Sequence, residues 1–237
     1  MEQQKTRLAQ AAIEACWRSA LGQVPGGAPM ILIANELLDC LPARQFVRTA
    51  RGWAERLVGV DEAGGLAFGL GPVPAGVALP VSLGEGAVVE ISDAQAALGG
   101  EIGAWIAQDG GAALLIDYGR DRFEPGDTLQ ALSGHNKVDP LITAGQADLT
   151  IHADFPAVLQ AARGAGCKTA ILTQGAFLRR LGIQARAQAL ARARADRAGV
   201  IDRQLARLVD DDQMGILFKA ACLYAAAAPP PGFEDAP

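Results

Sequence analysis

Residues 30–46 read MILIANELLDCLPARQF, and this stretch decides the fold. Its first part, 30–34, is a short apolar run typical of a strand that is buried on both faces of a parallel sheet. Asn35, Glu36 and Asp39 follow at once. Because open α/β sheets bind ligands at the carboxyl ends of their parallel strands, these polar residues are candidates for a site. Asn35 as the N-cap of a short helix, with both carboxylates solvated, explains the same pattern equally well.

The composition is that of a soluble globular protein with ample core material. The chain has 237 residues, of which 50% are hydrophobic and 20% are charged, enough for one large domain or two small ones. Its net charge of −5 argues against general nucleic-acid binding. No apolar run is long enough to span a membrane, and the polar start shows no secretory signal. We therefore expect a cytoplasmic protein.

Several patterns that carry chemistry in other proteins are unconvincing here. Residues 68–72 look like a glycine loop for nucleotides, but Pro72 and Pro74 would remove N–H donors and no helix follows. No Gly-x-Ser-x-Gly elbow is present, which argues against a serine hydrolase. The cysteines are too far apart for a zinc site, so we expect no metal and free, mostly buried thiols. They are Cys16, Cys40, Cys167 and Cys222.

Strand, helix and strand alternate through the first half of the chain, which argues for an α/β fold. An antiparallel β insertion is predicted over 46–91, with strands at 46–49, 53–60, 66–70 and 88–91 between glycine turns and a proline-rich loop. Ser92 and Gln95 have the form of a capping box and predict a helix to about Gln108. A second buried strand, 112–116, ends in Asp117 and Tyr118.

The polar segment 120–153 is too long for an ordinary connection, so we expect an ordered loop with a functional role. It contains His135, the better functional candidate of the two histidines. His152 fits better as a packed side chain beside Asp154, which caps the next helix. The rest of the chain predicts a strand at 168–173, a helical segment at 174–210 broken at Gly182 and Gly199, a strand at 215–224, and a disordered tail at 225–237.

Eight arginines lie in the helical segment 174–210. A solvated helix face is the ordinary explanation of such a charge run, and a basic docking face is the alternative. They are Arg179, Arg180, Arg186, Arg192, Arg194, Arg197, Arg203 and Arg207.

The polar motifs, taken in chain order, resemble the signature of the MidA-like methyltransferase family. The resemblance covers nearly the whole chain with family-like spacing. Its segments are Asn35-Glu36-x-x-Asp39-x-Leu41-Pro42-x-x-Gln45-Phe46, Asp117-Tyr118-Gly119, Asp127-Thr128-Leu129-Gln130, Gly134-His135, Asp139-Pro140-Leu141, Gly145-x-x-Asp148-Leu149-Thr150-x-x-x-Asp154-Phe155, Thr173-Gln174-Gly175-x-Phe177-Leu178-x-x-Leu181-Gly182-Ile183 and Met214-Gly215-x-Leu217-Phe218-Lys219.

This resemblance implies a Rossmann-like class I methyltransferase sheet of seven strands, mostly parallel with an antiparallel end strand. On that map 30–34 is the fourth strand, 112–116 the fifth, and 168–173 and 216–224 the last two, within a partial domain over 1–224. The family's glycine-rich cofactor loop and the acidic end of its second strand are not found in this sequence. We therefore expect a sheet that is incomplete at the N-terminus, with an unpaired edge and only part of the cofactor site.

The resemblance also implies a function, because the mitochondrial member of the family is a protein arginine methyltransferase that assists assembly of respiratory complex I. The expected cofactor is S-adenosylmethionine, and the expected partner is a protein substrate such as a respiratory complex subunit. Homodimerisation stays open.

Methyl transfer mainly requires alignment of donor and acceptor, which suggests roles for the polar residues. Glu36 would orient the guanidinium by paired hydrogen bonds, and Asn35 would shape the cofactor pocket. Asp39 would hold a second guanidinium nitrogen or brace the turn. The substrate channel would be lined by Asp117, Tyr118 and His135. The alternative from another class is a non-catalytic assembly module that docks a partner through its arginine-rich helices.

Overall fold

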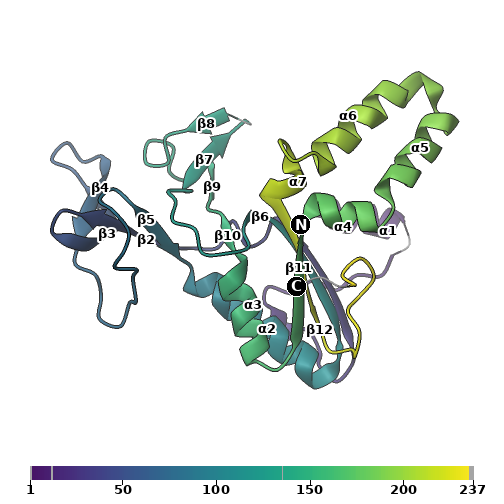
Figure 1. Ribbon diagram of the computed structural model, residues 1–237, viewed down its shortest axis with the longest axis horizontal. Helices are drawn as coiled ribbons and strands as arrows, with labels where there is room; N and C mark the ends of the chain where they lie inside the picture. The colour runs from purple at the N-terminus through teal and green to yellow at the C-terminus, as the bar shows by residue number, and fades with distance from the viewer. Residues whose placement is uncertain (1, 12, 135, 235–237) are drawn as a thin grey trace.

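A mixed sheet lies at the centre of the computed structural model, which describes residues 2–11, 13–134 and 136–234 (Figure 1). Its strands, in spatial order, are β1 (Met30–Asn35), β6 (Gly111–Arg120), β12 (Phe218–Tyr224) and β11 (Lys168–Thr173). β1 runs parallel to β6, whereas β12 is antiparallel to both of its neighbours. The antiparallel strand is thus last in sequence but lies inside the sheet, and not at its end.

β1 is an edge strand, and the expected burial on both faces is wrong. Leu32 packs against the core, whereas Ile31 and Ile33 on the opposite face are 86% and 71% exposed. The reason is that helices cover only one face of the sheet at this edge. They are α2 (Asp93–Asp109) and α3 (Phe155–Gly164). Among the described residues no strand pairs with the outer edge of β1.

Two glycines let α2 and α3 approach closely. A Cβ atom on Gly99 would lie 2.4 Å from the carbonyl oxygen of Val158, and one on Gly103 would lie 2.8 Å from the Cα of Ala162. No other residue fits at these positions without a shift of α3. The helix pair formed in this way covers the core face of the sheet and places the N-terminus of α3 beside the end of β6.

The expected β insertion is present as an antiparallel sheet beside the main one. Its strands are β2 (Arg44–Thr49), β3 (Gly52–Val60), β4 (Leu66–Gly71) and β5 (Val88–Ile91), in the order β4-β3-β2-β5. The segment rejected as a glycine loop is strand β4. The long polar segment forms a second small antiparallel sheet from β7 (Gln130–Ser133), β8 (Asn136–Val138) and β9 (Asp148–Thr150), and the short β10 (Ala153–Asp154) then pairs with the end of β6.

The helical segment projects from the main sheet on the side away from the β insertion (Figure 1). It consists of α4 (Gln174–Arg180), α5 (Ile183–Ala193), the short 3-10 turn η2 (Ala195–Arg197), α6 (Ala198–Val209) and α7 (Met214–Leu217). The break at Gly182 is confirmed, since this residue has φ 81° and is the N-cap that precedes α5. The break predicted at Gly199 is wrong, because the chain turns at Arg194 and η2 instead. The final strand begins at Phe218, after a helical turn.

The tail is ordered over 225–234, which contradicts the predicted disorder there; residues 235–237 lie outside the described part of the chain. Phe233 is 2% exposed, and its ring centroid lies 4.8 Å from that of Phe177 in α4. Burial of this aromatic ring outweighs the proline-rich composition on which the prediction rested.

The shorter helices and the thiols complete the description. The N-terminal segment contains α1 (Glu2–Gln10) and the 3-10 turn η1 (Leu21–Gln23). No helix in the described part of the chain is both long and apolar enough to cross a membrane. The four cysteines are free, and Cys167 and Cys222 are buried. Cys16 and Cys40 are exposed, so the expectation of mostly buried thiols is wrong for these two.

Candidate active site

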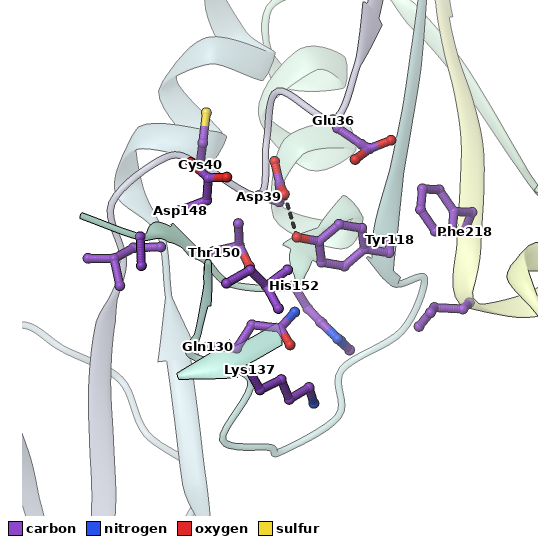
Figure 2. A pocket seen from close by; sticks show the side chains of 14 residues that line it. Glu36, Asp39, Cys40, Tyr118, Gln130, Lys137, Asp148, Thr150, His152 and Phe218 are labelled. Carbon is purple, nitrogen blue, oxygen red and sulfur yellow. Dashed lines mark hydrogen bonds between the residues drawn. The ribbon is translucent and has the colours of Figure 1, made fainter. Parts of the chain in front are cut away.

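A cavity of about 740 Å³ opens where β1 and β6 end (Figure 2). Its wall comes from the turn after β1, the end of β6, the small β7–β9 sheet and the start of β12. The lining residues are Glu36, Asp39, Cys40, Tyr118, Gln130, Leu132, Lys137, Ala147, Asp148, Leu149, Thr150, His152, Leu217 and Phe218. This is the edge of the sheet at which α/β folds bind their ligands.

Glu36 lines this cavity and lies in a strained backbone conformation. Its φ of 50° is the one positive φ of a non-glycine residue in the described ranges. Such a conformation costs free energy and is found most often at functional sites. This backbone conformation turns the chain after β1. The Glu36 carboxylate accepts a hydrogen bond of 3.1 Å from the Asn35 side-chain amide. Asn35 itself is exposed and lies outside the cavity lining.

Asp39 and Tyr118 meet inside the cavity. The Tyr118 hydroxyl donates a hydrogen bond to the Asp39 carboxylate, drawn as a dashed line in Figure 2. Asp39 is only 6% exposed, so this hydroxyl fixes a buried carboxylate in one orientation. Burial and the neighbouring Asp39 raise the pKa of Tyr118, which keeps the phenol protonated as a donor.

Asp117 lies behind the cavity and not in its wall, which differs from the predicted place in the substrate channel. It is 1% exposed, and its Oδ2 atom accepts hydrogen bonds from the backbone N–H groups of Leu38 at 2.8 Å and Asp39 at 3.2 Å. Burial raises the pKa of the Asp117 carboxyl to about 6, and the charge of Asp39 adds to the rise. Through its two hydrogen bonds to Leu38 and Asp39, the Asp117 carboxylate holds the turn that carries Asp39.

A buried glutamine holds the same turn from another side. Gln95 in α2 is fully buried; its Nε2 donates to the Leu38 carbonyl at 2.8 Å, and its Oε1 accepts from the Asp154 backbone N–H at 2.7 Å. The capping box is thus only half present: Ser92 caps the Gln95 N–H, but the Gln95 side chain points to the turn and to α3. The Ile151 N–H donates to the Asp39 carbonyl. Every backbone N–H and C=O group of residues 38 and 39 therefore has a hydrogen-bond partner.

Three rings form one side of the cavity. The centroid of the Tyr118 ring lies 5.7 Å from that of His152 and 5.4 Å from that of Phe218, both in edge-on geometry. Burial lowers the pKa of His152, which favours the neutral imidazole at neutral pH. Aromatic rings beside carboxylates are suited to a flat cation.

The sequence predictions missed much of this wall. His152 was read as a packed residue, and Phe218, Gln130, Lys137 and Asp148 were not singled out. Their place in the long polar segment and in the last motif of the family resemblance was the only signal for them. The predicted candidate His135 lies outside the described residues. In the part of the chain that the structure describes, no group of three or more His, Cys, Asp and Glu side chains has an arrangement suited to a metal ion.

Comparisons with known proteins place this chain in a family. A family model described as "Putative S-adenosyl-L-methionine-dependent methyltransferase" matches residues 1–173. The mouse protein arginine methyltransferase NDUFAF7, mitochondrial, is 35% identical over 181 residues, which cover 75% of this chain and 41% of the mouse protein. The human protein of the same name is 34% identical over 178 residues, covering 73% of this chain and 40% of that protein. The chain thus spans about two fifths of the length of these relatives.

Two crystal structures from Burkholderia thailandensis share the fold. An uncharacterised protein superimposes with a TM-score of 0.83 at 29% identity, covering 98% of this chain and 65% of that one. A second protein, solved with S-adenosyl-homocysteine bound, gives a TM-score of 0.79 at 28% identity and covers 99% of this chain and 62% of that one. Together these findings confirm the family resemblance and the Rossmann-like α/β fold. The chain belongs to the S-adenosyl-L-methionine-dependent methyltransferase family.

Proposed function

We propose that this chain carries the acceptor site of a methyltransferase that modifies arginine side chains in a protein. The observation that carries the proposal is the cavity after β1 and β6, which combines the carboxylates of Glu36, Asp39 and Asp148 with an aromatic wall. Among the described residues that line it, Lys137 is the one lysine or arginine. Two relatives with 35% and 34% identity are named protein arginine methyltransferases, which supports the same acceptor.

A guanidinium group matches the chemistry of this cavity. It is planar and always charged, it donates paired hydrogen bonds to carboxylates, and it stacks on aromatic rings. Glu36, one of the residues that line the cavity (Figure 2), would accept from two of its N–H groups. Asp39, fixed by the Tyr118 hydroxyl, would hold the guanidinium from the inner side.

The described residues fit one side of an S-adenosylmethionine site. Asn35 offers an exposed amide at the end of β1, and the Glu36 carboxylate beside it suits a positively charged sulfonium. When bound, this cofactor supplies an activated methyl carbon. The bound S-adenosyl-homocysteine in a relative of the same fold supports this choice of cofactor.

The chain also offers a group to take up the proton of the reaction. The acceptor nitrogen gains a bond to the methyl carbon, the sulfur–carbon bond breaks, and one N–H proton must leave the guanidinium. His152 lines the cavity and is kept neutral by burial, so its imidazole is able to accept this proton. A subunit of a respiratory complex is the acceptor protein that the family resemblance suggests.

Replacement of Glu36 by Gln tests the proposal. Transfer of a labelled methyl group to an arginine peptide should fall roughly 10- to 100-fold, since a hydrogen bond to a charged group contributes about 1.5–3 kcal/mol. Calorimetric titration with S-adenosyl-homocysteine should be unchanged. Glu85→Gln, an exposed residue outside the cavity, is the matched control.

Two results would contradict the proposal. Full turnover in Glu36→Gln would remove the assigned role of this carboxylate. No binding of S-adenosyl-homocysteine and no methyl transfer by the unmodified chain, with binding of a partner protein retained, would favour the non-catalytic assembly module.

A further inference from the structure

Glu90 in β5 is a buried carboxylate that lies outside the wall of the cavity. Its side chain belongs to a residue that is only 3% exposed. The Oε1 atom accepts hydrogen bonds from Gln45 Nε2 at 2.8 Å and from the Thr128 N–H at 2.9 Å. The Oε2 atom accepts one from the Thr128 hydroxyl at 2.5 Å. Three donors thus hold a charged group that burial by itself would disfavour.

The hydrogen bonds continue from Thr128 to a residue of the cavity. Thr128 Oγ1 accepts from the backbone N–H of His152 at 2.9 Å. A carboxylate can only accept, so Glu90 fixes the single hydroxyl proton of Thr128 and leaves the lone pairs of this oxygen free for His152. The buried carboxylate therefore sets the direction of both bonds.

The β insertion holds Glu90 in place. Gln45 in β2 pairs directly with Glu90 and with Arg56 in β3, so the three side chains form one row across the insertion sheet. Arg56 Nη1 donates to Gln45 Oε1 at 3.0 Å and to Asp127 Oδ2 at 2.7 Å. Gln45 Nε2 also donates to Asp127 Oδ1 at 2.8 Å. The insertion thereby fixes Asp127 and the threonine that follows it.

The imidazole of His152 depends on its backbone for its position. Among the described residues no side chain forms a hydrogen bond with this ring, and its aromatic neighbour is Tyr118, at 5.7 Å between ring centroids (Figure 2). The next residue begins β10, which pairs with the end of β6. Together with the Thr128 hydroxyl, this pairing fixes the backbone from which the ring reaches the cavity.

We propose that Glu90 and Thr128 are positioning residues, which hold the His152 imidazole beside the acceptor so that it takes the proton leaving the guanidinium nitrogen. The inference rests on the proposed role of His152 and gives the β insertion a part in the reaction. Burial lowers the pKa of His152, and the negative charge of Glu90 opposes this shift. Glu90 therefore also stabilises the imidazolium that the proton transfer produces.

NMR of the imidazole protons tests the positioning without cofactor or substrate. The chain has two histidines, so isotope-labelled histidine gives two sets of ring signals, and His135→Gln assigns those of His152. The ring current of Tyr118 should shift the His152 signals away from those of an unstructured histidine. Thr128→Val keeps the side-chain volume but removes the hydroxyl, so most of this shift should be lost. Thr128→Ser should retain it.

Methyl transfer to an arginine peptide tests whether the reaction needs this position. Thr128→Val should lower kcat roughly 10- to 100-fold, because a general base contributes on the order of 100-fold or more. KM should stay within about threefold, since Glu36 and Asp39 are unchanged. Thr128→Ser should recover most of kcat. Serine restores the hydroxyl but not the methyl group, so this rescue separates the hydrogen bond from packing.

Two further variants are matched to Thr128→Val. Glu90→Gln keeps the shape of the side chain but places an amide donor against the Thr128 hydroxyl, so it should move the His152 signals and lower kcat as well. It carries the test if circular dichroism shows that Thr128→Val is unfolded. Thr143→Val makes the same chemical change elsewhere on the long polar segment, where the hydroxyl donates to the Asp139 carbonyl at 2.7 Å. It should leave both readouts unchanged.

Two results would overturn the inference. One is a set of His152 signals that neither Thr128→Val nor Glu90→Gln moves, and the other is full kcat in a variant whose His152 signals have moved. Failure of the proposed function gives a different result: no methyl transfer by the unmodified chain, with ring signals that still depend on the Thr128 hydroxyl. That result would reject the acceptor and support the positioning of His152.

Discussion

Replacement of Gln95 by Met would test how the turn after β1 is held in place. Methionine has a similar length and no hydrogen-bonding amide, so the packing volume in α2 stays nearly the same. The change removes the donor to the Leu38 carbonyl at 2.8 Å and the acceptor of the Asp154 N–H at 2.7 Å. Gln95 is fully buried, so water cannot replace either partner without opening the structure.

The expected cost follows mainly from the Asp154 N–H, which is left without its acceptor, whereas the Leu38 carbonyl still accepts from the Leu41 N–H at 3.1 Å. A buried group without a partner costs about 1–3 kcal/mol, so Gln95→Met should lower the free energy of unfolding by about 1–3 kcal/mol. Such a loss is large beside a typical total of about 5–15 kcal/mol. Since Leu38 precedes Asp39, the KM for an arginine peptide should rise as well.

Urea denaturation followed by tryptophan fluorescence measures this loss, with the dependence on urea concentration as a check that the denatured state is unchanged. Gln108→Met, on the exposed side of the same helix, is the control and should stay within about 0.5 kcal/mol of the unmodified chain. A loss below about 1 kcal/mol in Gln95→Met, or one equal to that of the control, would refute the bridging role.

Two further predictions concern packing and pH. Gly103→Ala should destabilise the chain by about 1–3 kcal/mol, because its Cβ would meet Ala162 in α3. Gly100→Ala, whose Cβ would have 3.9 Å to its nearest neighbour, should be neutral or stabilising, and thermal unfolding of both variants checks the difference. Burial raises the pKa of Asp117 from its ordinary 3.8 to about 6 in the folded chain, so its stabilising contribution is complete below about pH 3.8 and is lost as the pH rises through about 6. The free energy of unfolding should therefore fall by up to about 3 kcal/mol between pH 4 and 6, and Asp117→Asn should lack this fall. An equal pH dependence in both proteins would contradict the raised pKa of Asp117.

The local elements were predictable because their signals are local. Ser92 and Asp154 cap helices that begin as their patterns indicate, and the insertion strands are bounded by the expected turns. Burial was less predictable, since it depends on distant elements. The apolar run 30–34 gives no indication that helices cover only one face of β1. The order of the tail was also hidden, because it rests on contact between Phe233 and Phe177.

The candidate site was predicted in part. Glu36, Asp39 and Tyr118 lie around one cavity, although their assigned roles stay predictions. Asp117 was misplaced because neighbouring residues of a strand point to opposite faces, and Tyr118 takes the cavity side. His152 reaches Tyr118 only because β10 pairs with the end of β6, a contact that the sequence does not reveal.

In the part of the chain that the structure describes, the outer edge of β1 is unpaired, which makes the stability of this chain depend on its surroundings. Any strand that binds there, from whatever source, adds RT ln(1 + [L]/Kd) to the free energy of unfolding, by mass action. The same strand leads directly into Glu36, so a binder would order the backbone beside the strained residue as well. Melting temperatures of this protein therefore carry meaning only together with the concentrations at which they were measured.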